Sequence, residues 1–156
     1  MLEAGDRAPA FTLPDQNGEK VKLSDLKGET VVLYFYPRAD TPGCTTQACG
    51  IRDRRADYKK AGVRVIGVSP DSVEDVKKFA DKFDLDFTLL ADADHAVAEK
   101  YGTWIEKSMY GRKYWGNARS TFIIGPNGKI ARALPKVSPK THDETVLKAL
   151  AELASS

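Results

Sequence analysis

The strongest constraint on the fold is a continuous apolar segment at residues 30–36, TVVLYFY. Most of its residues are β-branched or aromatic and none is charged, which is typical of a strand that is covered on both faces. Such a strand lies inside a sheet that has helices on either side. We therefore expect an α/β fold in which residues 30–36 form the central strand.

Apolar periodicity, turn residues and caps predict further elements on both sides of this strand. The predicted strands are 20–23, 64–69, 87–90, 121–124 and 129–133, and the last two form a hairpin. The predicted helical segments are a turn at 24–27, a helix at 73–83 capped by Ser72, a helix around 95–101, and a C-terminal helix that opens with a capping box at 141–144. Together these elements predict a mixed sheet with helices on both faces.

The length of 156 residues and the hydrophobic content of 42% are sufficient for one compact domain, which we expect to span residues 1–156. Such a chain needs no disulfide or metal for stability, so its two cysteines are free for chemistry. The 24 basic and 22 acidic residues are interspersed, and this balance selects neither nucleic acid nor an anionic membrane as a partner.

No apolar run approaches the ~20 residues needed to cross a bilayer. The first residues, MLEAGD, have neither the basic nor the apolar region of a secretory signal. We therefore expect a cytoplasmic protein. In that reducing compartment, a pair of nearby cysteines is more often redox-active or metal-binding than structural.

The most informative segment, PRADTPGCTTQAC at residues 37–49, lies where the central strand ends and the next helix begins. Thr41 is a suitable N-cap and Pro42 a suitable first helical residue, which makes Cys44 the third residue of the helix. An acidic side chain at that position interacts favourably with the unpaired amides of the first turn. The same amides favour the thiolate form of Cys44, and hence a nucleophile.

Two other interpretations of the cysteines are less consistent with their context. Free cysteines are often small buried hydrophobes, which suits Cys49 but does not explain the Thr-Pro-Gly that precedes Cys44. Two thiols also form only half of a zinc site, and His95 and His142 fall in separate predicted helices without ligand spacing. We therefore expect no metal and no other cofactor.

The spacing of the two cysteines makes a mechanistic prediction. Residues five positions apart on one helix have Cα atoms about 8.7 Å apart. A disulfide tolerates a separation of up to about 7 Å. Cys44 and Cys49 can therefore react with each other only if the start of the helix unwinds.

These residues resemble those of the Q-type peroxiredoxins, also called bacterioferritin-comigratory proteins. Peroxiredoxins share the spacing of Pro37, Thr41 and Cys44, and the Q-type pattern TPGCTxEAC is met here as TPGCTTQAC. The similarity also covers residues 5–11, 110–114 and 119–124. It implies a thioredoxin-like fold with a mixed central sheet flanked by helices and an N-terminal hairpin extension.

The resemblance also implies an activity, the reduction of hydrogen peroxide and organic hydroperoxides. Cys44 would attack the peroxide and become a sulfenic acid, and Cys49 would resolve it by forming an intramolecular disulfide. A thioredoxin or similar dithiol would reduce that disulfide. Because the resolving thiol is in the same chain, we expect a monomer.

The resemblance assigns the remaining site residues as well. Thr41 would hydrogen-bond the peroxide and Arg119 would complete the catalytic site. Pro37, Pro42 and Gly43 would shape the substrate pocket. Gln47 stands where the family usually has Glu, so one negative charge near Arg119 is absent.

Three further groups of residues have plain structural interpretations. The aromatic stretch between Tyr101 and Trp115 predicts half-buried packing of a loop against the sheet. His95 is expected to be an ordinary helix residue and His142 to lie in an exposed first helical turn. Gly125, where the family commonly has an acid, is expected to affect only a turn.

Two alternative functions use the same cysteines. A redox sensor would use the Cys44–Cys49 disulfide to change its affinity for a partner. A dithiol–disulfide oxidoreductase is also consistent with such a fold, but its expected spacing is Cys-x-x-Cys and this chain has four intervening residues.

Overall fold

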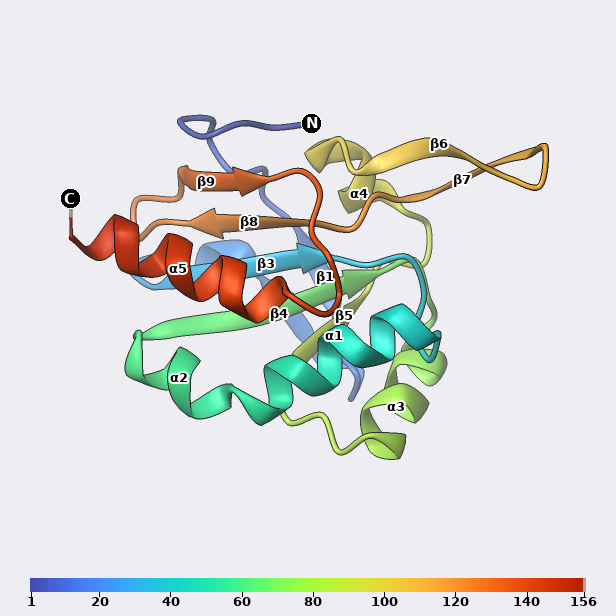
Figure 1. The fold of residues 1–156 in the computed structure, drawn as a ribbon, viewed down its shortest axis with the longest axis horizontal. Coiled ribbons are helices and arrows are strands. Elements are labelled where there is room, and N and C mark those ends of the chain that lie inside the picture. The colour runs from blue at the N-terminus through green and yellow to red at the C-terminus, as the bar shows by residue number, and fades with distance from the viewer. Residues whose placement is uncertain (156) are drawn as a thin grey trace.

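A computed structural model of the protein describes residues 1–155. Its centre is a five-stranded mixed sheet of order β5-β4-β3-β8-β9 (Figure 1). The strands are β3 (Thr30–Phe35), β4 (Val63–Ser69), β5 (Thr88–Ala91), β8 (Ser120–Ile124) and β9 (Ile130–Leu134). Strands β3, β4 and β5 are parallel, whereas β8 and β9 are antiparallel to their neighbours. The prediction of an α/β fold with β3 at its centre is confirmed.

Helices and loops cover both faces of the sheet, which explains why β3 is apolar throughout. One face packs on α1 (Pro42–Asp53), α2 (Arg55–Lys60), α3 (Val73–Lys82) and α5 (His142–Ala154). The other face packs on the N-terminal segment, the short 3-10 helix η1 (Leu23–Leu26) and α4 (Ala96–Tyr101). Alternate side chains of β3 pack in the two cores. Val32 and Tyr34 pack in the first, and Val31 and Leu33 in the second.

Two hairpins lie outside the central sheet. The first, β1 (Thr12–Pro14) with β2 (Lys20–Lys22), is the expected N-terminal hairpin. The second, β6 (Trp104–Met109) with β7 (Arg112–Asn117), projects from the body (Figure 1). No helix within residues 1–155 is both long enough and apolar enough to cross a membrane.

The aromatic stretch corrects one prediction. Tyr101 is fully buried, but Tyr110, Tyr114 and Trp115 are 98%, 42% and 58% exposed. These three residues lie on the β6–β7 hairpin, which projects from the body instead of packing against the central sheet as expected.

The helix starts show which local predictions hold. Ser72 caps α3 as predicted, because its side chain accepts a hydrogen bond from the amide of Asp75. The prediction of a capping box at the start of α5 is wrong, since Thr141 makes no side-chain cap hydrogen bond.

The prediction that His142 lies in an exposed first helical turn is also wrong. The residue is 1% exposed, and its Nε2 lies 2.9 Å from Thr121 Oγ1. The first turn of α5 packs on the sheet beside β8, which buries the imidazole.

Candidate active site

Cys44 lies in the first turn of α1, which follows the carboxyl end of β3 after the loop at residues 36–41. Thr41 occupies the N-cap position with an extended backbone and Pro42 is the first helical residue, so Cys44 is the third, as predicted. The Thr41 side chain makes no cap hydrogen bond. Its hydroxyl instead donates to the carbonyl of Arg38 at 2.8 Å. The predicted register is therefore confirmed, although the capping bond that suggested it is absent.

Arg119 is the charged partner of Cys44. Its Nη2 lies 3.5 Å from Cys44 Sγ, and the cysteine is only 2% exposed. The two residues are 75 positions apart in the chain. The sheet brings them together because β8 runs antiparallel to β3, with Ser120 opposite Phe35 at the end where α1 begins.

Gly43 allows Arg119 to approach this closely. A Cβ atom on Gly43 would lie 3.0 Å from Arg119 Nη2 and 3.5 Å from Pro139 Cγ. A side chain here would crowd the guanidinium away from the start of α1. The two prolines expected in the pocket flank this region, with Pro37 half-buried after β3 and Pro42 exposed in the first turn of α1.

Gln47 holds the other side of the guanidinium. Its Oε1 accepts a hydrogen bond from Arg119 Nη1 at 2.7 Å, and the residue is 1% exposed. Within residues 1–155, Arg119 forms no ion pair with a carboxylate, and Gln47 Nε2 has no hydrogen-bond partner. The positive charge of Arg119 therefore faces Cys44 without a neighbouring anion to offset it.

We expect Gln47→Glu to make Cys44 less reactive at neutral pH. A carboxylate at this position would pair with Arg119 and offset the positive charge that lies beside the Cys44 sulfur. The rate of Cys44 alkylation by iodoacetamide at pH 7 should fall roughly fivefold.

Gln47→Leu is the matched control for this change, because it removes the hydrogen bond without adding a charge. Its alkylation rate at pH 7 should match that of wild type. An unchanged rate for Gln47→Glu would show that the charge of Arg119 does not act on the sulfur.

Asn117 is a buried polar residue near the site that the sequence analysis did not single out. It is fully buried, and its Nδ2 donates to the carbonyl of Tyr36 at 3.2 Å, while its Oδ1 accepts from Thr103 Oγ1 at 3.2 Å. These bonds tie the end of β7 to the chain just before Pro37. The sequence contains no motif that would single out this asparagine.

His142 and Thr121 form a buried polar pair in the core beneath α1. The imidazole also packs at an angle against the Tyr34 ring, with centroids 5.6 Å apart. Burial, together with the positive charge of Arg119, lowers the pKa of His142 from its ordinary 6.5 to about 4. The imidazole is therefore neutral at physiological pH and has a hydrogen-bonding role here.

This lowered pKa predicts a loss of stability in acid. Between pH 6.5 and about 4 the unfolded chain binds a proton on His142 that the folded chain does not bind. Stability then falls as the pH falls, by about 3 kcal/mol at the lower end. His142→Gln removes this contribution, so urea unfolding at a series of pH values should show a shallower decline for the variant.

The neighbouring carboxyl of Asp143 has the opposite effect on stability in acid, because burial raises its pKa and the folded chain then binds that proton more readily than the unfolded chain. Asp143 is present in both wild type and His142→Gln, so the difference between their pH profiles of stability reports the contribution of the imidazole. Parallel pH profiles for wild type and His142→Gln would contradict the prediction.

Cys49 lies on the same helix as Cys44, and both thiols are free. Cys44 is buried and Cys49 is half-buried. Their positions in one continuous helix confirm the premise of the spacing argument. Among the residues that the structure describes, no group of three or more His, Cys, Asp or Glu side chains is arranged to hold a metal ion.

Comparison with known proteins agrees with this geometry. The model of the AhpC/TSA family matches residues 4–133. The chain is 50% identical over 153 residues to Peroxiredoxin Bcp of Escherichia coli K12, a match that covers 98% of both proteins. This chain belongs to the Q-type peroxiredoxins of the AhpC/TSA family.

Solved structures of Q-type peroxiredoxins have the same fold as this peroxiredoxin. The bacterioferritin comigratory protein of Xanthomonas campestris, described in connection with alkyl peroxide reduction, superposes with a TM-score of 0.90 at 35% identity, covering 97% of this chain and 99% of that one. A cysteine-to-serine variant of Xylella fastidiosa PrxQ superposes with a TM-score of 0.92 at 32% identity, covering 99% and 98%. The peroxiredoxin is therefore a thiol peroxidase with a thioredoxin-like fold.

Proposed function

We propose that this peroxiredoxin reduces hydrogen peroxide and organic hydroperoxides with Cys44 as the attacking thiolate. The 3.5 Å contact between Arg119 Nη2 and Cys44 Sγ is the observation that carries the proposal. The sulfur attacks one peroxide oxygen, the O–O bond breaks, and Cys44 becomes a sulfenic acid. The departing oxygen leaves as hydroxide or alkoxide and takes up a proton to give water or an alcohol.

Arg119 and Thr41 have complementary roles in this step. The guanidinium places positive charge and N–H donors where the departing oxygen becomes negative. The Thr41 hydroxyl gives its proton to the carbonyl of Arg38, so its oxygen is left to accept a hydrogen bond from the peroxide O–H. Pro37, Pro42 and Gly43 form the walls around the reacting atoms.

Resolution uses Cys49. Its thiol condenses with the Cys44 sulfenic acid, forming an S–S bond and releasing water. Residues five apart on a helix are about 8.7 Å apart between Cα atoms, so the first turns of α1 must unwind. The start of α1 is suited to this, because it has neither a side-chain cap hydrogen bond nor an acidic residue in its first turn.

A thioredoxin or similar dithiol then reduces the disulfide by thiol–disulfide exchange and returns α1 to its helical form. We assign the enzyme to the cytoplasm, where reduced dithiols of this kind are maintained. We also propose that it acts as a monomer, because both thiols belong to one chain and no partner subunit is needed for turnover.

Cys49→Ser tests the resolving step. The variant should complete one oxidation by peroxide and stop, with Cys44 held as a sulfenic acid. The mass of the peptide that contains both positions should increase by one oxygen, whereas the wild-type peptide should lose two hydrogens. Excess peroxide should convert the variant to the irreversible sulfinic acid faster than it does the wild type.

Steady-state assays with a thioredoxin system and NADPH distinguish this function from that of a sensor. Wild type should turn over many times, and Cys49→Ser should not be recycled. Slow, stoichiometric oxidation of wild type without turnover would favour a redox sensor. A wild-type peptide that does not lose two hydrogens would contradict an intramolecular disulfide.

A further inference from the structure

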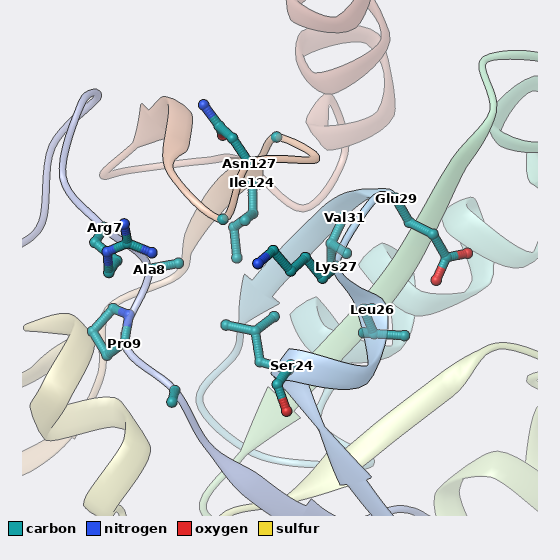
Figure 2. Close-up of a pocket in the computed structure, with 14 residues that line it drawn as sticks. Arg7, Ala8, Pro9, Ser24, Leu26, Lys27, Glu29, Val31, Ile124 and Asn127 are labelled. Carbon is teal, nitrogen blue, oxygen red and sulfur yellow. The ribbon is translucent and has the colours of Figure 1, made fainter.

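A cavity of about 420 Å³ lies near the start of β3. Its lining residues are drawn in Figure 2. Its lining includes Val31, near the start of the strand, whereas α1 begins beyond the end of the strand. From Val31 to the end of β3 at Phe35 the strand is about 13 Å long, at 3.3 Å per residue. The cavity is therefore separate from the peroxide site.

Three segments that are distant in sequence form the walls. They are the N-terminal segment at 7–10, η1 with the loop that follows it, and the turn between β8 and β9. Backbone hydrogen bonds join these walls, from Ala8 N to Gly128 O at 2.9 Å, from Leu23 N to Phe11 O at 3.1 Å, and from Gly28 N to Pro126 O at 3.1 Å. The cavity is thus pre-formed, as small-molecule sites usually are.

The floor of the cavity is apolar. Ala8, Leu26, Val31 and Ile124 line it, and each is less than a tenth exposed. All four belong to the core on the α4 side of the sheet. A ligand with an apolar body would therefore extend an existing hydrophobic core and be shielded from water.

The rim carries two cations. Arg7 and Lys27 line the opening, and neither forms an ion pair within residues 1–155. Figure 2 shows the Lys27 ammonium directed into the opening, toward the side where Arg7 lies. The one acidic residue in the lining, Glu29, has its carboxylate turned away and pairs with Arg64 at 3.1 Å.

We propose that this cavity binds a small amphipathic carboxylate, with its apolar tail on the floor and its anionic head between Arg7 and Lys27. The volume lies within the range of roughly 300–1,000 Å³ found for small-molecule sites. A guanidinium binds a carboxylate through two parallel hydrogen bonds, which favours this head group over a neutral one. The proposal does not depend on the peroxidase activity, since it involves neither cysteine.

Titration of the isotopically labelled protein with octanoate, followed by amide NMR, tests the proposal. Saturable shifts should appear at Ala8, Val31, Ile124 and Gly128, with none at Cys44. Octanol has the same tail without the charge, and should bind about tenfold more weakly. Saturation at other residues alone would overturn the proposal, as would no saturation up to about 10 mM octanoate.

The double variant Arg7→Gln/Lys27→Gln tests the role of the two cations. Both side chains are exposed, so the variant should fold and keep its peroxidase activity. We expect its affinity for octanoate to fall about tenfold, to the level seen with octanol. Lys20→Gln, an exposed lysine outside the cavity, is the matched control and should bind like wild type. Equal affinity in the double variant and the wild type would refute the anionic site.

Discussion

Cys44→Ser should lower the rate of hydroperoxide reduction by at least about a thousandfold, because a serine hydroxyl is not ionised at neutral pH and is a far weaker nucleophile than a thiolate. No other described cysteine occupies the same environment, since Cys49 lies five positions further along α1 and away from its first turn. The loss should appear both in single-turnover oxidation and in assays coupled to a thioredoxin system.

The fold should survive this substitution. Serine is close to cysteine in size, and its oxygen can accept a hydrogen bond from Arg119 in place of the sulfur. Thermal unfolding of Cys44→Ser should therefore stay near that of wild type. Cys49→Ser is the matched control, because it removes the other thiol and should keep the first oxidation. Undiminished turnover by Cys44→Ser would show that another group attacks the peroxide.

Arg119→Met should have the second-largest effect, lowering kcat/KM for hydroperoxide by roughly a hundredfold or more. Methionine retains part of the apolar packing of the arginine stem but removes both guanidinium contacts, to Cys44 Sγ and to Gln47 Oε1. It removes the charge that favours the thiolate as well as the charge that stabilises the departing oxygen. The two losses act in the same direction.

Comparing alkylation with peroxide reduction can separate these two contributions. Alkylation by iodoacetamide needs the thiolate but involves no departing oxygen, so its rate reports the first contribution alone. The deficit of Arg119→Met in peroxide reduction should therefore exceed its deficit in alkylation. Arg112→Met, on the exposed β7 strand, is the control and should behave like wild type. If alkylation and peroxide reduction fell equally, Arg119 would have no role in the departure of oxygen.

Much of the local architecture was predictable because it depends on neighbours in the sequence. An uninterrupted apolar run specifies a strand buried on both faces, and β3 has alternate residues in two cores. The Thr-Pro sequence at residues 41–42 predicts a helix start and places Cys44 in its first turn, where the structure has it. The five-residue spacing then predicts that two thiols on one helix cannot meet without unwinding.

The surroundings of Cys44 depend on contacts between distant segments. Arg119 is one of many basic residues, and its role could be inferred from sequence only through the family resemblance. The antiparallel register of β8 on β3 brings it to the sulfur. In the same way, Asn117 reaches the Tyr36 carbonyl across the chain. No local pattern encodes such pairings, because side chains far apart in sequence meet only when the strands align.

The wrong predictions for His142 and for the aromatic stretch also arise from contacts between distant segments. His142 has the sequence context of an exposed first turn, yet the packing of α5 against the sheet buries it beside Thr121. Tyr110 and Trp115 are apolar enough to be buried, yet they lie on a hairpin that projects from the body. The sequence alone determined where the strands of the central sheet, the start of α1 and the reactive thiol lie, since short-range sterics and hydrogen bonding specify these. Tertiary structure decided which charges and rings surround that thiol, because burial is a property of the assembled layers.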